Sequence, residues 1–136
     1  MTTYRPIGAR VVSYGVAIVL IVVSAAIAIA LPDNIVFTGS QIATLGLILL
    51  GILTALHGIG RSYVRADDVG LDILNGYRRH QVAWSEIRAI AMKRGAPWPS
   101  LILKGPDERH IILFAIQGSD GDAASRAVAE LVRRLP

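Results

Sequence analysis

Residues 11–31 read VVSYGVAIVLIVVSAAIAIAL, and no residue in this stretch is charged. Twelve of these 21 residues are Val, Ile or Leu. A bilayer core about 30 Å thick is crossed by about 20 helical residues. The β-branched run at residues 18–23 could also form a buried strand. The length of the stretch and its uncharged surroundings favour a membrane-spanning helix instead.

A second apolar stretch runs from about Gln41 to Gly60. Its one ionisable residue, His57, lies one turn before Arg61. We therefore expect His57 near the membrane interface, where hydrogen bonding is favoured over proton transfer. The sequence predicts that residues 1–61 form a transmembrane hairpin, with helices at about 11–31 and 41–60.

The flanking charges predict the orientation of the hairpin. Arg5 and Arg10 flank the first helix, Arg61 and Arg65 follow the second, and residues 32–40 contain no Lys or Arg. We expect a protein of the plasma membrane. By the positive-inside rule, both of its termini are expected in the cytoplasm. A cleaved signal peptide is the alternative, with Ala-x-Ala at residues 26–28 or 28–30. The apolar stretch is longer than such peptides require.

Small residues form one face of the second predicted helix: Thr44, Gly51, Ala55 and Gly58. Such residues let the backbones of two helices approach closely. One interpretation is that this face packs against the first helix of the hairpin. The other is that it docks on a different membrane protein.

The composition of the chain excludes several classes of protein. The 136 residues are 53% hydrophobic with a net charge of +4, and residues 61–136 hold 12 of the 14 basic residues and nine of the ten acidic ones. No basic run exceeds two residues, which argues against nucleic-acid binding. There is no Cys, phosphate-binding loop or metal-ligand spacing. We expect no enzymatic activity, no metal and no cofactor.

Residues 62–136 show short β-like runs and then one helical pattern. The predicted strands are 62–66, 69–74, 77–82, 87–92, 100–104 and 109–116, with a type I′ turn at Asn75-Gly76. Ala124, Ala127, Val128, Leu131 and Leu135 form an apolar stripe at helical spacing. Asp120 or Asp122 is expected to cap this helix. The fold class is therefore α+β, with a helix closing a bent antiparallel sheet.

Residues 77–90, YRRHQVAWSEIRAI, resemble a stretch of bacterial pleckstrin-homology-like (PH-like) domains. The whole chain is similar to small actinobacterial membrane proteins in which two helices precede such a domain. This resemblance implies a strongly bent, nearly barrel-like sheet that is capped by the C-terminal helix. The family fold has seven strands, whereas the sequence indicates six. Asp67, Asp68 and Asp72 around the first turn would repel phosphate, so the resemblance does not imply phosphoinositide binding.

Two groups of residues have the character of an interaction surface. Lys93 and Arg94 precede Trp98, which stands between Pro97 and Pro99 and is either presented for docking or folded over the end of the barrel. Arg61, Arg65, Arg78 and Arg79 are expected to form, with Lys93 and Arg94, either a basic surface toward anionic lipid or an ordinary solvated face. Trp84 is expected to pack at the rim of the core.

Two functions are compatible with these features. The first is an accessory or scaffold protein that docks on other integral membrane protein subunits, for example in a respiratory or transport assembly. The second is a membrane-anchored module that senses anionic lipids. We favour the first, because the carboxylates at residues 67–72 weaken a headgroup pocket.

Overall fold

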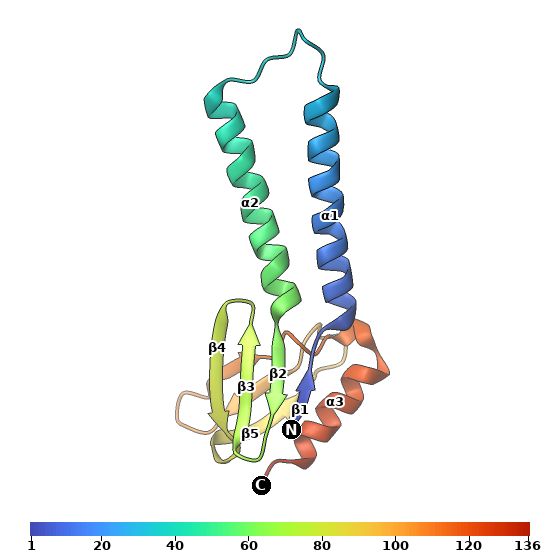
Figure 1. The fold of residues 1–136 in the computed structure, drawn as a ribbon. Helices are drawn as coiled ribbons and strands as arrows, with labels where there is room; N and C mark the ends of the chain where they lie inside the picture. Colours follow the sequence, from blue (N-terminus) through green and yellow to red (C-terminus); the bar gives the residue numbers. More distant parts are fainter.

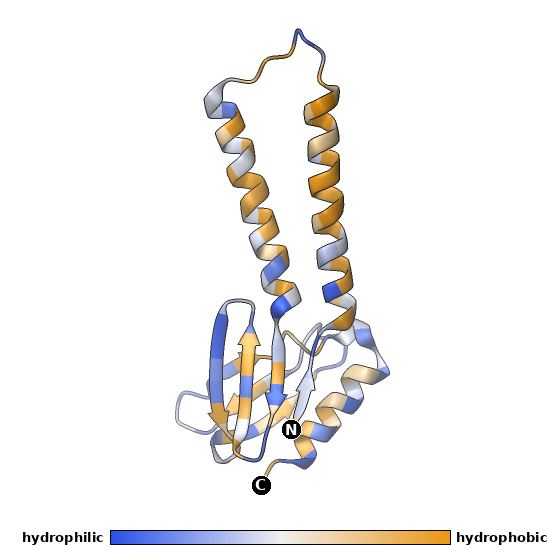
Figure 2. Ribbon diagram, in the orientation of Figure 1, coloured by the Kyte–Doolittle hydropathy of each residue, from blue (hydrophilic) through white to orange (hydrophobic).

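The computed structural model describes residues 1–136 as a pair of long helices that stand on one small β domain (Figure 1). Helix α1 spans Ile7–Ala30 and helix α2 spans Gly39–Arg61. Each is long and apolar enough to cross a membrane, and both are hydrophobic over most of their length (Figure 2). The predicted pair of long apolar helices is confirmed. Helix α1 begins four residues earlier than expected, directly after the buried Pro6.

The β domain contains seven antiparallel strands in two sheets. The first sheet has the order β1-β2-β3-β4, formed by Thr2–Tyr4, Tyr63–Ala66, Gly70–Asn75 and Arg78–Ala83. The second has the order β5-β6-β7, formed by Ile87–Ala91, Ser100–Leu103 and His110–Ile112. Helix α3, Asp122–Arg133, follows the strands and packs beside the sheets (Figure 1).

Strand β1 is the feature that the sequence did not reveal. It precedes the first helix and pairs with β2, so that Thr2 lies opposite Ala66 and Tyr4 opposite Val64. Residues 2–4 therefore belong to the β domain, although the prediction assigned all of residues 1–61 to the hairpin. The chain leaves the sheet from β1 into α1 and returns from α2 into β2. The two helices consequently rise from neighbouring strands.

The core lies between the two sheets and α3. Its fully buried side chains include Val64, Ile73, Leu101, Leu113 and Leu131. Ala124, Ala127 and Leu131 form the buried stripe of α3, as the sequence predicted. Neither Asp120 nor Asp122 caps this helix through its side chain. The helix begins instead after Gly121, whose φ of 60° is a conformation that glycine adopts without strain.

Two local predictions differ from the structure. The turn between β3 and β4 consists of Gly76 and Tyr77, because Asn75 already pairs with Arg78. Only Gly76 has a positive φ, as in a type II′ turn rather than the expected type I′. The last predicted strand, 109–116, is shorter and covers only His110–Ile112. The residues after it turn inward, so that Leu113, Ala115 and Ile116 are buried.

Candidate docking site at the base of the second helix

The turn between β3 and β4 lies against the end of α2. The hydroxyl of Tyr77 donates a hydrogen bond of 2.6 Å to the carbonyl oxygen of Thr54. The guanidinium carbon of Arg61 lies 5.1 Å from the centre of the Tyr77 ring. A Cβ atom on Gly58 would come within 2.9 Å of Cε2 of that ring. The absence of a side chain at Gly58 therefore lets Tyr77 pack along the helix.

Two polar side chains fix this junction further. Ser62 Oγ donates to the carbonyl oxygen of Gly58 at 3.0 Å and accepts from the amide of Gly76 at 2.9 Å. Asn75 Oδ1 accepts from the amide of Phe114 at 3.2 Å, and its Nδ2 donates to the carbonyl oxygen of Ile112. The end of α2, the first sheet and the segment after β7 are thus joined by hydrogen bonds.

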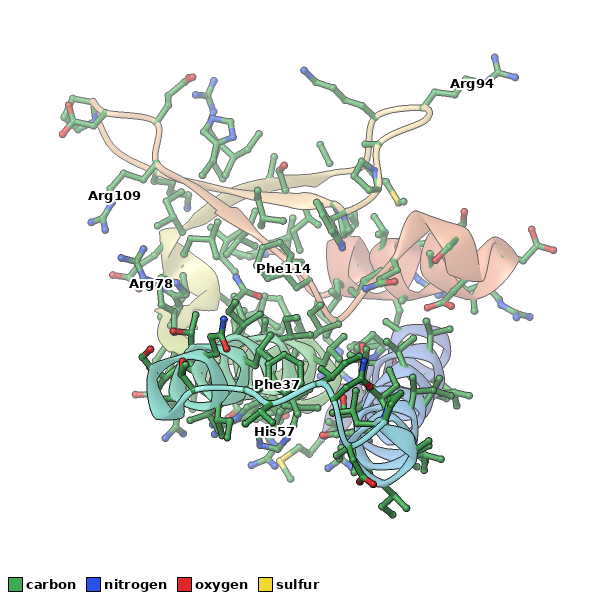
Figure 3. All side chains as sticks on the ribbon, turned by 90° about the horizontal axis from the view of Figure 1, so that it is seen from above. Phe37, His57, Arg78, Arg94, Arg109 and Phe114 are labelled. Atoms are coloured by element: carbon green, nitrogen blue, oxygen red, sulfur yellow. The ribbon has the colours of Figure 1, made fainter.

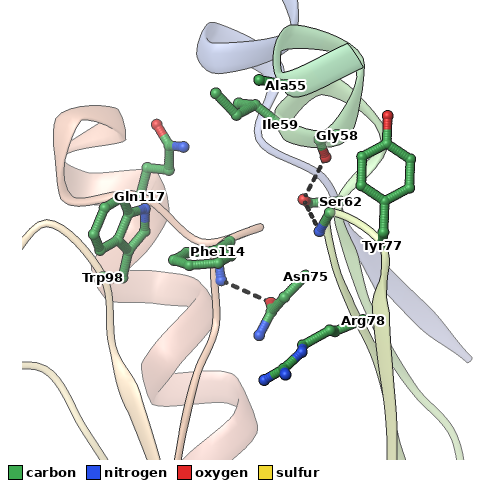
Figure 4. A pocket seen from close by; sticks show the side chains of 11 residues that line it. Ala55, Gly58, Ile59, Ser62, Asn75, Tyr77, Arg78, Trp98, Phe114 and Gln117 are labelled. Carbon is green, nitrogen blue, oxygen red and sulfur yellow. Dashed lines mark hydrogen bonds between the residues drawn. The ribbon is translucent and has the colours of Figure 1, made fainter. Parts of the chain in front are cut away.

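An apolar cavity of about 550 Å³ opens between the base of α2 and the β domain. Ala55 and Ile59 line it from the helix, while Trp98 and Phe114 line it from the domain (Figure 4). The two aromatic rings meet edge to face, with their centres 5.0 Å apart. Arg78 and Gln117 supply polar groups in the lining. Trp98 is half-buried, so its ring is neither fully exposed for docking nor fully buried over the end of the barrel.

The small residues of α2 lie on the face turned away from α1. In the body of α2 the half-buried positions are Leu49, Leu53 and Leu56, at the i, i+4, i+7 spacing of a single helix face. Gly51 lies about 160° from this face, at about 100° per residue. Thr44, Gly51 and Ala55 are exposed, and a Cβ on Gly51 would meet nothing within 4 Å. Packing of these three residues against α1, one of the two interpretations, is therefore not observed.

Gly58 is the one buried member of the predicted small-residue face, and it contacts Tyr77. Thr44, Gly51 and Ala55, which we call the small-residue face from here on, remain open along α2. Ala55 also lines the cavity that contains Trp98. The small-residue face and the cavity are consequently one continuous surface.

The expected basic surface is divided among different environments. Arg79 forms a two-pronged ion pair with Asp72, at 2.8 and 2.9 Å. This pairing holds the pKa of Asp72 below its ordinary value of 3.8 and raises that of Arg79. The guanidinium of Arg65 lies 5.4 Å from the centre of the Tyr63 ring. The other two arginines of this expected surface lie elsewhere: Arg78 lines the apolar cavity, and Arg61 contacts Tyr77 at the end of α2.

The loop before β6 contributes less to the site than the sequence suggested. Lys93, Arg94 and Pro97 are exposed, and Arg94 projects away from the helices (Figure 3). The carbonyl oxygen of Pro97 accepts from the amide of Gly118 at 2.8 Å, which ties the loop to the segment before α3. Only Trp98 of this group lines the cavity. Sequence reasoning missed Phe114 and Tyr77; the Asn-Gly-Tyr turn was the available signal for Tyr77.

The first turn of the domain is occupied by its own carboxylate. Asp67 Oδ1 accepts from the amides of Val69 and Gly70, both at 2.8 Å, and these bonds lower its pKa. Trp84 Nε1 donates to the carbonyl oxygen of Asp67 at 2.8 Å. Trp84 is half-buried and packs against the core, which confirms its expected place at the rim.

Two apolar helices rising from adjacent strands of a helix-capped, seven-stranded antiparallel domain define the class: a small β domain carried by a helical hairpin. Residues 61–134, more than half of the chain, match the family described as Bacterial PH domain, and the chain belongs to this family. No curated protein and no solved structure matches the chain. Strand β1 and the hairpin up to residue 60 lie outside the matched residues.

Proposed function

We propose that this protein is a non-enzymatic accessory protein of the plasma membrane that docks on another integral membrane protein. Its hairpin crosses the bilayer with both termini in the cytoplasm, where the Bacterial PH domain lies. The observation that carries this proposal is the continuity of the small-residue face with the apolar cavity. A partner helix leaving the membrane beside α2 would contact both. A subunit of a respiratory or transport assembly is one example of such a partner.

The chemistry of the surface suits a transmembrane helix as the occupant. Thr44, Gly51 and Ala55 lack large side chains, so another helix backbone can approach α2 closely. Where that helix reaches the cytoplasm, a bulky apolar side chain fits between Trp98, Phe114 and Ile59. Trp, Tyr and Arg are the residue types that contribute most to protein interfaces. Trp98, Tyr77 and Arg78 place all three in the lining of the cavity.

Lipid sensing by the β domain has weaker support. Of the six basic residues that could form a lipid-binding surface, Arg79 is paired with Asp72 and Arg65 stacks on Tyr63. The turn at residues 67–70 is held by the carboxylate of Asp67. A phosphate group approaching this turn would meet negative charge.

Two glycines of α2 provide a matched test of whether a partner docks on the small-residue face. Gly51 is on the small-residue face, whereas Gly46, five residues earlier, lies about 140° around the helix. A Cβ on either residue would meet nothing within 4 Å, so larger side chains are compatible with the fold at both. A photo-cross-linking amino acid is placed at residue 51 or residue 46 of the full chain in its native membrane.

We expect irradiation to yield one discrete protein adduct from residue 51 and none from residue 46. Gly51→Leu should abolish co-purification of that protein in mild detergent, while Gly46→Leu should leave it unchanged. Equal adducts from both positions, adducts to lipid alone, or adducts only to a second copy of this chain would contradict the proposal.

A further inference from the structure

A second cavity, of about 290 Å³, lies at the base of the helix pair, on the side of α2 opposite the small-residue face. Three arginines line it: Arg5, Arg10 and Arg61. Arg5 lies two residues before α1, Arg10 lies in the first turn of that helix, and Arg61 is the last residue of α2. The cavity therefore collects these three arginines near the helix ends that join the β domain. Figure 1 shows these helix ends above β1 and β2.

None of these three guanidinium groups is within ion-pair distance of a carboxylate, although Arg5 also lines a neighbouring pocket together with Asp120. None of them forms an ion pair or donates a side-chain hydrogen bond, and no Asp or Glu lines the cavity. The ion pairs of the chain are formed by three different arginines, Arg79, Arg88 and Arg134. Three like charges around one cavity repel each other, and an anion between them removes that repulsion. Guanidinium groups match the geometry of phosphate oxygens particularly well.

Tyr14 and His57 give this cavity a fixed wall. The hydroxyl of Tyr14 lies 3.1 Å from Nδ1 of His57, within hydrogen-bond distance. The Tyr14 ring occupies space that Gly60 leaves open, because a Cβ there would lie 2.7 Å from the ring. A phenol and an imidazole beside three arginines add hydrogen-bonding groups at the same height along the helices.

The surface above the cavity indicates the source of the anion. Two turns farther from the domain, Leu50 follows the face of His57 and Ile21 follows the face of Tyr14. Their side chains are 59% and 50% exposed, so acyl chains can lie along them. We infer that this cavity binds the phosphate group of an anionic phospholipid whose chains run along the hairpin. This inference does not depend on the proposed docking of a partner, because the small-residue face lies on the other side of α2.

Native mass spectrometry of the full chain in detergent tests the inference. The probes are phosphatidylglycerol, phosphatidylcholine and inorganic phosphate, each added at equal concentration. We expect the wild type to retain one phosphatidylglycerol in preference to the other two. The double substitution Arg10→Gln/Arg61→Gln should reduce this retention by about tenfold or more, since each basic residue near anionic lipid contributes severalfold to binding.

The matched control is Arg109→Gln/Arg126→Gln, which removes the same charge from two exposed residues without ion pairs. Arg109 projects from the far side of the domain (Figure 3). This control should keep wild-type retention. Arg5→Gln, at an exposed residue whose side chain forms no ion pair, should lower retention about fivefold. Equal loss in the control, no loss in the Arg5 and Arg10/Arg61 variants, or equal retention of inorganic phosphate would overturn the inference.

Discussion

The effect of Gly58→Ala on stability should depend on Tyr77. The substitution should destabilise the protein when Tyr77 is present and stabilise it when Tyr77 is replaced by Ala. In the wild type, the new Cβ would lie 2.9 Å from the Tyr77 ring and force it away from α2. The Tyr77–Thr54 hydrogen bond, worth about 1 kcal/mol, and the Arg61 contact, worth about 0.5–1 kcal/mol, would then be lost. Ala stabilises a helix by about 1 kcal/mol relative to Gly. The net result is a loss of about 0.5–1 kcal/mol.

In a Tyr77→Ala background the same substitution meets no ring. Gly58→Ala should then stabilise the protein by about 1 kcal/mol, which gives an interaction energy of about 1.5–2 kcal/mol between the two positions. Denaturant titration of the full chain in detergent measures these values, because both tryptophans report on the β domain. Gly46→Ala, in open surroundings, is the control and should show no interaction with Tyr77. An equal gain in stability from Gly58→Ala in both backgrounds would refute the described packing of Tyr77 on α2.

Three further predictions concern the β domain. Because Arg79 lowers the pKa of Asp72 below 3.8, the pair contributes its full stabilisation above about pH 4, and this contribution is lost as the pH falls through the lowered pKa. By denaturant titration, Asp72→Asn should be less stable than the wild type at pH 7, and this difference should shrink as the pH is lowered. Burial and the nearby carboxylate of Glu130 raise the pKa of Tyr4 to about 12, so wild-type stability should decline from about pH 10 upward. Tyr4→Phe removes the ionisable hydroxyl and should decline less over the same pH range. Replacing Thr2–Tyr4 by three glycines should cost about 2–3 kcal/mol and speed amide exchange in β2, its pairing partner; unchanged exchange would contradict the pairing.

Elements with a strong periodic pattern could be predicted from the sequence. The two apolar helices, the order of strands β2 to β7 and the buried stripe of α3 follow from hydrophobic period and turn residues. Strand β1 could not be predicted in this way. Thr2–Tyr4 is three residues long, has no alternating apolar pattern and is separated from its partner β2 by both helices. Its pairing is a tertiary contact that only the folded hairpin creates.

The candidate site was predicted in its parts but not in its arrangement. Trp98 and the small residues of α2 stood out by residue type, yet nothing in the sequence placed them on the same side of the molecule. That placement depends on Tyr77, which docks on Gly58, and on Asn75, which binds the segment at Phe114. The sequence left open whether the six basic residues form one surface or a solvated face, and it did not reveal that Asp72 and Tyr63 engage Arg79 and Arg65 after folding.

The orientation of the helix pair is the claim on which the proposed function depends. The chain contains no Cys, so single cysteines can be introduced at Asn34, in the loop between the helices, and at Asp107, in the turn between β6 and β7. A membrane-impermeant maleimide is then applied to intact and to permeabilised cells. The account predicts labelling of residue 34 in intact cells and of residue 107 only after permeabilisation. Labelling of residue 107 in intact cells would contradict it.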